Sequence, residues 1–356
     1  MKTKVLVLSL LAAFAGTAAA QSTQVEIYGR INTSVEVQST TGESNTIGLV
    51  NDSSRWGIKG SEDLGNGMNA FFQLESGFAS DTGRLSNNGG IFNREAFMGL
   101  GTKLGTVRFG RITSPVYFAS ADYISLHNHD TGNSSDALFG FAATGVNNNN
   151  SVTYKTPSFA NGDIEVAYSF NANATEQPGA SNNQRNVQVA YNATFGALQV
   201  GAGVAQMLDA DVKAPGAPTQ DGPKNRSAVV RALYEVGPFI LAGYYEYAKL
   251  YVPSVDDDRS RNTLRLVGAY LVGNNEFHVN VGRAGDFDGL DKSGATQWTV
   301  GYNYNLSKRT RVYTFYTKIS QDDNTNYYLG SDYGWGVNSR LGASYSSYGL
   351  GLRHNF

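Results

Sequence analysis

The stretch SSRWGIKGSEDLGNGMNAFFQLESGF, residues 53–78, decides the fold together with NREAFMGLGTKLGTVRFGR, residues 93–111. Apolar and polar residues alternate through both segments. Trp56 and Ile58 share one parity, and Arg55 lies on the other. Alternate side chains leave a β-strand on opposite faces, so the pattern indicates strands with one apolar and one polar face. A soluble sheet with one wet face would show the same alternation. Whether the apolar face meets a protein core or lipid must therefore be decided from the rest of the chain.

The first twenty residues have the features of a secretory signal peptide. Two lysines precede an apolar run at residues 5–15, and an A-x-A cleavage site ends at Ala20. We exclude residues 1–20 from the fold and expect residues 21–356 to form one domain. Removing the two lysines from the 28 Lys and Arg leaves 26 against 30 Asp and Glu, a formal charge of about −4. This charge does not indicate a nucleic-acid partner.

The composition favours a membrane β-barrel. The chain has no cysteine, so a small disulfide-stapled scaffold is disfavoured. Beyond the signal peptide there is no apolar run of about 18 residues, the length that a transmembrane helix needs. The 41 glycines, 21 tyrosines and 18 phenylalanines describe a strand-rich, aromatic and rather polar chain. Such a composition is typical of barrels in which one face of each strand meets water and the other meets lipid.

The alternation predicts sixteen strands, an even number that lets both chain ends lie on one side of a closed antiparallel barrel. Their ranges are 24–37, 53–60, 68–78, 92–101, 106–111, 150–156, 163–170, 185–192, 197–208, 225–236, 239–250, 260–271, 276–283, 294–305, 310–319 and 345–356. Short glycine-rich connections alternate with long polar ones, as periplasmic turns alternate with extracellular loops. The predicted fold class is therefore all-β, a 16-stranded antiparallel transmembrane β-barrel. The third long loop, residues 112–149, has no sustained period, and we expect it to fold into the lumen.

Charged and aromatic residues test this assignment. An arginine on the lipid face near the midplane costs roughly 2 to 4 kcal/mol. Arg231 and Arg265 each lie between apolar neighbours, so both can point inward. Arg111 instead shares the parity of Val107 and Phe109, and we expect a bulge or a strand end there.

Aromatic residues cluster near the predicted strand ends, which favours girdles at the two membrane boundaries. Cross-strand aromatic pairs in a soluble sandwich are the alternative. The residues are Tyr168, Phe170, Tyr191, Tyr234, the tyrosines of residues 244–247, Tyr302, Tyr304, Tyr348 and Phe356.

Five segments resemble the general porins of Gram-negative bacteria, and most closely the neisserial and β-proteobacterial branch. They are SRWGIKGSEDLGNGMNAFFQLE at 54–75, NREAFMGLGTKLGTVRFGR at 93–111, NSVTYKTP at 150–157, LSKRT at 306–310 and GLGLRHNF at 349–356. The resemblance spans essentially the whole mature chain. It implies a sixteen-stranded homotrimer in the outer membrane of a Gram-negative bacterium, with a constriction formed by the third long loop. It also implies that the terminal Phe356 is the signal read by the outer-membrane assembly machinery.

The resemblance further implies a constriction in which basic side chains face carboxylates. By motif, Arg55 of SRWG, Arg94 of NREA and Glu75 of FQLE match this arrangement. Relatives often carry an arginine three residues before the NS of NSVTY, where this chain has Asn147, and this departure weakens the basic ladder. The further residues of the expected constriction are Lys59, Arg108, Arg111 and the acids of the inward loop, Asp122, Asp130 and Asp136.

A basic constriction would lower the cost of entry for chloride or small carboxylates, because charges beside a low-dielectric wall are incompletely screened. We therefore expect passive diffusion of small hydrophilic solutes with a preference for anions. The alternative is that these charges only form the wet face of a structural barrel, screened beyond about 8 Å at physiological salt.

Two other functions remain open, an outer-membrane hydrolase and a passive structural or adhesive barrel. A hydrolase needs a nucleophile or an activated water beside a base such as histidine. The four histidines are His127, His129, His278 and His354. No serine is evidently paired with His278 or His354, and His127, His129 and Asp130 form only a weak metal pattern. A passive barrel is disfavoured because sixteen strands leave an aqueous channel.

Cofactor patterns are equally weak. The segment GAGVAQ, residues 201–206, lacks the third glycine and the helix of a dinucleotide fingerprint. We expect no cofactor, no metal and no enzymatic activity. The aspartate runs at 256–258 and 322–323 lie in long loops. They are either solvated or bind divalent ions that bridge lipopolysaccharide in the surrounding outer-membrane lipid.

Overall fold

The computed structural model describes residues 23–86, 90–120, 145–170, 185–209, 225–252, 255–327 and 340–356. The expected signal peptide and the loop aspartates Asp122, Asp130 and Asp136 lie outside these ranges. The described chain consists of antiparallel strands and one short helix. No helix in these ranges is long and apolar enough to cross a membrane.

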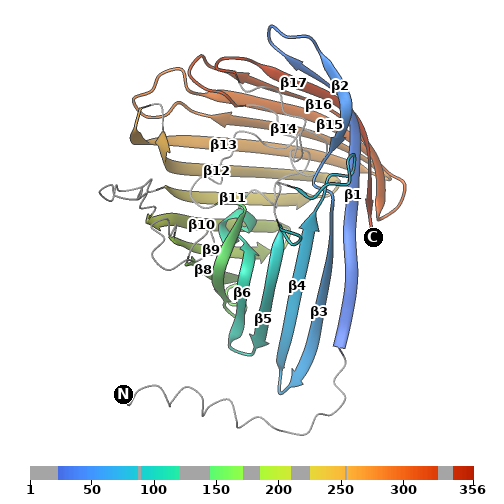
Figure 1. Cartoon of the computed structure of the whole chain (residues 1–356), viewed down its shortest axis with the longest axis vertical. Coiled ribbons are helices and arrows are strands. Elements are labelled where there is room, and N and C mark those ends of the chain that lie inside the picture. Colours follow the sequence, from blue (N-terminus) through green and yellow to red (C-terminus); the bar gives the residue numbers. More distant parts are fainter. Residues whose placement is uncertain are drawn as a thin grey trace.

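The strands of the described ranges belong to a single sheet (Figure 1). The elements are β1 (Thr23–Thr40), β2 (Thr46–Asn51), β3 (Arg55–Gly65), β4 (Met68–Gly77), β5 (Glu95–Thr102), β6 (Gly105–Thr113), α1 (Pro115–Phe118), β7 (Asn147–Lys155), β8 (Gly162–Ser169), β9 (Arg185–Phe195), β10 (Leu198–Asp209), β11 (Arg226–Val236), β12 (Phe239–Val252), β13 (Asp257–Val272), β14 (Asn275–Ala284), β15 (Ala295–Asn305), β16 (Thr310–Gln321) and β17 (Tyr345–Asn355).

The sheet closes on itself. Each strand from β3 to β16 pairs antiparallel with the strand that follows it, and β17 pairs with β1 from Arg30 opposite Asn355 to Thr40 opposite Tyr345. Because β2 and β3 both pair with β1, over different parts of its length, the seventeen strands fill sixteen positions. Figure 1 shows β1, in blue, alongside β17, in red. The predicted 16-stranded antiparallel barrel is confirmed.

One part of the predicted element order is wrong. The sequence pattern assigns the residues up to Asn51 to a polar loop, but residues 46–51 form β2. The strand forms because β1 continues past its predicted end to Thr40, so that its backbone offers partners to these six residues. A run of six is too short for its alternation to stand out. Ser53, with a φ of 55°, then interrupts the backbone before β3 begins.

The barrel has apolar side chains on its outer face and polar side chains on its inner face, the reverse of a soluble protein. On the outer face, Leu241 and Leu266 are 55% and 58% exposed. On the inner face, Glu36 and Arg265 are buried. An apolar exterior around a polar interior is what a barrel needs to lie in a bilayer, where every backbone group is paired within the sheet.

Aromatic rings run in series across β12–β15 close to the short turns. The ring centroids of Phe239 and Tyr270 lie 5.0 Å apart, those of Tyr270 and Phe277 lie 6.4 Å apart, and those of Phe277 and Tyr302 lie 5.1 Å apart. The assignment of Tyr244 to a girdle is wrong, because even-numbered residues of β12 face inward and Tyr244 is buried there. Phenol rings therefore serve both at the membrane boundary and in the lumen.

The C-terminal residue fastens the closing seam. Backbone hydrogen bonds of 3.0 Å run in both directions between Gly29 and Phe356. A Cβ atom at Gly29 would lie 2.3 Å from the Phe356 ring, so the ring occupies the space that a side chain at position 29 would need. The half-exposed ring covers the outer face of β1. Its role as an assembly signal stays a prediction.

Candidate functional site

A row of basic residues faces the lumen from β3 to β6. Arg55 begins β3, Arg94 directly precedes β5, and Arg108 and Arg111 lie on β6. We term these four residues the ladder wall. Arg55 pairs in register with Arg30 of β1, a lumen-facing base that the sequence motifs do not single out.

Glu75 holds Arg94. The Nε atom of Arg94 donates to Oε1 of Glu75 at 2.5 Å, and the hydroxyl of Tyr28 donates to the other carboxylate oxygen at 2.9 Å. Glu75 is buried, so this ion pair is shielded from bulk water. The structure thus brings together the two residues that the motifs NREA and FQLE suggested, and it adds Tyr28.

Arg108 is compensated in a way that the motifs do not reveal. Its guanidinium forms an ion pair with Glu165 of β8, and its Nε donates to the hydroxyl of Thr153 at 3.2 Å. The guanidinium also lies over the ring of Phe97, 5.3 Å from the centroid. Much of the positive charge of Arg108 is therefore balanced within the wall.

Within the described part of the chain, the Arg111 side chain donates its hydrogen bonds to neutral partners. The strand register shifts between Gly110 and Ile112, and Gly110 has a φ of 138°, so the predicted bulge is confirmed. The bulge turns Arg111 so that its Nε donates to the carbonyl of Asn93 at 2.9 Å and its Nη1 to Oδ1 of Asn149 at 2.6 Å. Carbonyl oxygens hold a guanidinium in place without cancelling its charge.

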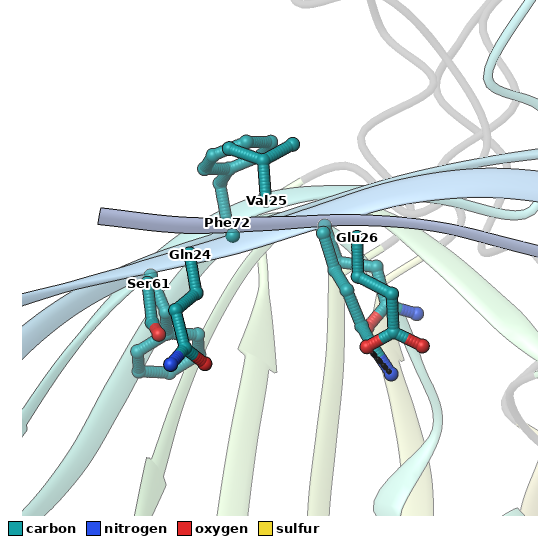
Figure 2. A pocket seen from close by; sticks show the side chains of 9 residues that line it. Gln24, Val25, Glu26, Ser61 and Phe72 are labelled. Carbon is teal, nitrogen blue, oxygen red and sulfur yellow. Dashed lines mark ion pairs between the residues drawn. The ribbon is translucent and has the colours of Figure 1, made fainter. Parts of the chain in front are cut away.

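Lys59 lies apart from these residues. It stands four residues from Arg55 along β3, roughly 13 Å toward the short turns at about 3.3 Å per residue. Its Nζ is 3.2 Å from Glu26 and lies 5.0 Å from the Tyr28 ring centroid. Figure 2 shows Glu26 on the same side of the wall as Gln24 and Ser61, opposite Val25 and Phe72.

Asn147, at the end of the third long loop, is linked to Glu95 through the hydroxyl of Thr113. Its Nδ2 donates to the hydroxyl of Thr113 at 2.9 Å, and that hydroxyl donates to Glu95 at 2.7 Å. Gln73 also donates to Glu95, at 2.5 Å. At position 147 this chain therefore has an amide beside a carboxylate. Glu95 is a lumen-facing acid that the sequence motifs overlooked.

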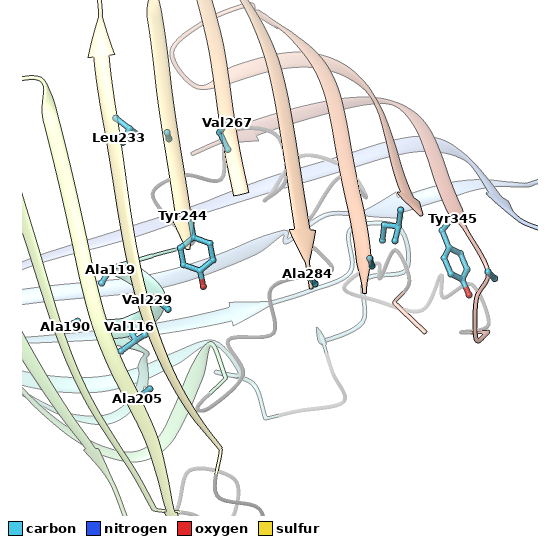
Figure 3. Close-up of a cluster of buried hydrophobic side chains, with 14 residues drawn as sticks. Val116, Ala119, Ala190, Ala205, Val229, Leu233, Tyr244, Val267, Ala284 and Tyr345 are labelled. Atoms are coloured by element: carbon cyan, nitrogen blue, oxygen red, sulfur yellow. The ribbon is translucent and has the colours of Figure 1, made fainter. Parts of the chain in front are cut away.

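The chain that follows β6 turns inward onto the inner face of β9 and β10, three and four strands along the sheet from β6. The hydroxyl of Ser114 donates to Gln188 of β9 at 2.6 Å, and the first turn of α1 is capped by the same serine. Val116 and Ala119 are buried in an apolar cluster with Ala190 and Ala205, whose side chains share the inner face (Figure 3). The described start of the third long loop, residues 114–120, therefore lies inside the barrel. Residues 121–144 lie outside the described ranges.

Two glycines make room for this segment. A Cβ atom at Gly201 would lie 2.1 Å from the carbonyl oxygen of Ala119, and one at Gly203 would lie 3.1 Å from the Val116 side chain. Glycine inside a strand often marks such a close approach of another backbone. The segment GAGVAQ, which fails as a dinucleotide fingerprint, has this structural explanation.

Three buried arginines lie on the wall that receives the segment, and we term Arg231, Arg261 and Arg265 the anchor wall. Their exposed fractions are 5%, 5% and 1%. Arg231 donates to the carbonyl of Ala119 at 3.0 Å and to Oδ1 of Asn192 at 2.9 Å. Arg261 lies over the rings of Phe287 and Tyr327, 4.9 and 5.3 Å from their centroids. The parity of Arg231 and Arg265 was readable from the sequence, but their burial was not.

Comparison with known proteins shows to which family this barrel belongs. Residues 7–324 match the family described as Gram-negative porin. The chain belongs to the Gram-negative porin family. Outer membrane porin protein 32 of Delftia acidovorans is 28% identical over the full length of both chains. An outer membrane porin protein of Bordetella pertussis is 36% identical, but that match spans about half of each chain, 49%.

Solved porin structures agree. The anion-selective porin from Comamonas acidovorans is 25% identical, with a TM-score of 0.73 over 94% of this chain and 100% of that one. The trimer form of OmpT from Vibrio cholerae shares the fold at 19% identity, with a TM-score of 0.67 over 94% of this chain and 100% of that one. This porin lies in the outer membrane and forms a water-filled channel for passive diffusion of small hydrophilic solutes.

Proposed function

We propose that this porin prefers anions and that the preference comes from the ladder wall. The observation that carries the proposal is the pairing of Arg111, whose guanidinium is held by the oxygens of Asn93 and Asn149 rather than by a carboxylate. The register of Arg55 with Arg30 adds a second concentration of positive charge on the same wall. The description of the related structure as an anion-selective porin supports this assignment.

The paired bases contribute less to this preference. Arg94 and Arg108 each contact a carboxylate, Glu75 and Glu165 respectively, and Glu95 adds an acid beside the neutral Asn147. A unit charge about 5 Å from a permeating ion contributes about 0.8 kcal/mol in water. Screening with a Debye length of about 8 Å roughly halves this energy, but the same charge attracts chloride and repels potassium, so the two contributions add to about 0.9 kcal/mol in the permeability ratio. One uncompensated arginine therefore changes the chloride-to-potassium permeability ratio about fourfold, and the expected preference is moderate.

Reversal potentials in planar bilayers under a KCl gradient test the proposal. We expect Arg111→Met to lower the chloride-to-potassium permeability ratio about fourfold. The matched control is Lys59→Met, which removes the same formal charge but about 13 Å from Arg55, beyond the Debye length of about 8 Å. A wild-type channel that prefers potassium, or equal shifts for the two variants, would contradict the proposal.

We propose further that the third long loop, residues 112–149, forms the constriction, with Asp122, Asp130 and Asp136, which lie outside the described ranges, among its residues. The support is the inward position of residues 114–120 against β9 and β10. We also propose a homotrimer, by analogy with the trimer form in the related fold. Mass photometry of the detergent-solubilised porin should then give one species of three chains.

We also propose that this porin is not an enzyme. His278, the base that the sequence offered for a hydrolase, is buried beside Glu276 and Asn303 on the inner wall. Glu276 is itself held by Arg311 and by Asn303, which suits a structural polar cluster. Neither lipid nor peptide should be hydrolysed by the purified porin. Turnover that disappears in the His278→Gln variant would contradict this.

The C-terminal Phe356 is proposed as the signal for the assembly machinery. Its support is the position of the residue at the closing seam, where its ring lies over Gly29. The variant Phe356→Ser should reach the outer membrane in reduced amount.

A further inference from the structure

Two bases stand side by side on the outer face of the barrel, near the end that carries the long loops. Arg226 begins β11, and Lys249 pairs with it in register on β12. The same level continues through Gln206 on β10, which pairs with Arg226, and Ser260 on β13, which pairs with Lys249. We term Gln206, Arg226, Lys249 and Ser260 the rim row. All four side chains can donate hydrogen bonds, and two carry a positive charge.

The pairing of Arg226 with Lys249 is unfavourable by itself. Like charges directly opposite one another on neighbouring strands destabilise the pair. Two of the three acids at the adjacent β12–β13 turn are engaged with other side chains, because Asp257 pairs with Arg259 at 3.2 Å and Asp256 accepts from the hydroxyl of Tyr251. An anion placed between the two bases would convert their repulsion into two charge-assisted hydrogen bonds.

An apolar groove adjoins Arg226 on the same outer face. Its apolar lining comes from four neighbouring strands and consists of Val187, Val204, Leu208, Ala228 and Tyr247. Val204 is 54% exposed, so the groove is open to the medium around the barrel. Because the porin lies in the outer membrane, that medium is the acyl region of the outer leaflet.

The two bases of the rim row and the adjoining apolar groove together favour an amphipathic ligand. A free phosphate would use the rim row but not the groove, and a neutral acyl chain would use the groove but not the charges. We propose that this face binds a phosphorylated lipid of the outer leaflet, with its phosphate on Arg226 and Lys249 and one acyl chain along Val204 and Ala228. Basic side chains at the membrane surface attract anionic lipid headgroups.

Binding is measured by native mass spectrometry of the porin in a zwitterionic detergent, with diphosphoryl lipid A as the probe. The double variant R226Q/K249Q should bind it at least tenfold more weakly than the wild type. The variant A228F leaves the charges in place but fills the groove, and should weaken binding about threefold to tenfold. Inorganic phosphate and dioleoyl phosphatidylcholine separate the headgroup contribution from the acyl contribution.

Arg283 provides the matched control. It also lies exposed on the outer face near the long loops, but its partners in register, Leu264 and Thr296, are neutral. The R283Q variant should bind lipid A as the wild type does. Equal losses in R283Q and the double variant would mean a diffuse charge effect and overturn the proposal.

Three other outcomes would also overturn it. The first is unchanged lipid A binding in R226Q/K249Q. The second is phosphate binding as tight as lipid A binding, which would indicate a site for the free ion. The third is a smaller oligomer in the double variant, which would make this face a protein contact. Single-channel selectivity should be unchanged in R226Q/K249Q, so the test is independent of the proposed anion preference.

Discussion

The ladder wall and the anchor wall both carry arginines into the same lumen, yet they use them differently. On the ladder wall, Arg111 and Arg94 are half-buried, and Arg111 is held by neutral oxygens. On the anchor wall, Arg231 is buried and donates to the backbone of the segment 114–120, which lies on the inner face of β9 and β10. The comparison teaches that the position of an arginine on the inner face does not define its role. Its role follows from whether solvent can reach the guanidinium and from what the guanidinium holds.

The difference has a geometric origin. Gly201 and Gly203 lack side chains, so the segment that contains α1 lies directly on β10 and covers the neighbouring Arg231. The bulge at Gly110 directs Arg111 toward Asn149, and among the described residues Arg111 stays half-buried where Arg231 is buried. We expect the ladder wall to set ion selectivity and the anchor wall to hold the constriction in place.

The largest loss of stability should come from filling the space between Gly201 and the segment 114–120. In Gly201→Ala the added Cβ would stand 2.1 Å from the Ala119 carbonyl, and a backbone atom cannot give way as a flexible side chain can. We expect a loss of about 1–3 kcal/mol in the free energy of unfolding, measured by guanidinium titration in detergent with tryptophan fluorescence.

The control for that variant is Gly243→Ala on β12, where the nearest atom to the new Cβ is 3.4 Å away. It should change the free energy of unfolding by less than about 0.5 kcal/mol. Equal losses in the two variants would show that the segment does not press on Gly201.

A loss of stability of similar size is expected from Arg231→Met. This change removes the donor to the Ala119 carbonyl and to Asn192, and leaving buried acceptors without a partner costs about 1–3 kcal/mol. We also expect larger fluctuations of the single-channel current, because the segment loses an attachment. Arg231→Lys, which keeps a charged donor, should restore part of the stability. Identical current noise in wild type and R231M would break the assignment of Arg231 as an anchor.

The smallest effect on selectivity should come from removing a compensated pair. The double variant R108M/E165Q takes away one positive and one negative charge that contact each other. Its reversal potential should differ little from that of the wild type, whereas each single variant should shift it in opposite directions. A large shift in the double variant would show that Arg108 acts on permeating ions without compensation from Glu165.

Much of the barrel could be predicted from the sequence, because lipid outside and water inside impose alternation on every strand. Trp56 and Ile58 share one parity and Arg55 has the other, as this alternation requires. Arg111 breaks the parity of its strand, and this irregularity predicted the bulge. The strand at residues 46–51 escaped prediction because its pairing depends on how far β1 extends. Local pattern does not contain that information.

The site was less predictable than the fold. The pair of Arg94 and Glu75 followed from motifs, but Glu165 pairs with Arg108 from 57 positions away, and Arg231 reaches a carbonyl 112 positions away. Such contacts depend on the closure of the barrel and on the path of the third long loop. The alternating glycines at 201 and 203 were the visible sign of that path, and their meaning depended on knowing what approached them.

The central claim is that the ladder wall sets ion selectivity and the anchor wall holds the segment 114–120. It is tested most directly by the reversal potentials of R111M and R231M in the same KCl gradient. Both variants replace one lumen-facing arginine with methionine, so the change in formal charge is identical. We predict a fall of about fourfold in the chloride-to-potassium permeability ratio for R111M and a change below about 1.5-fold for R231M. Equal shifts, or a larger shift for R231M, would contradict the account.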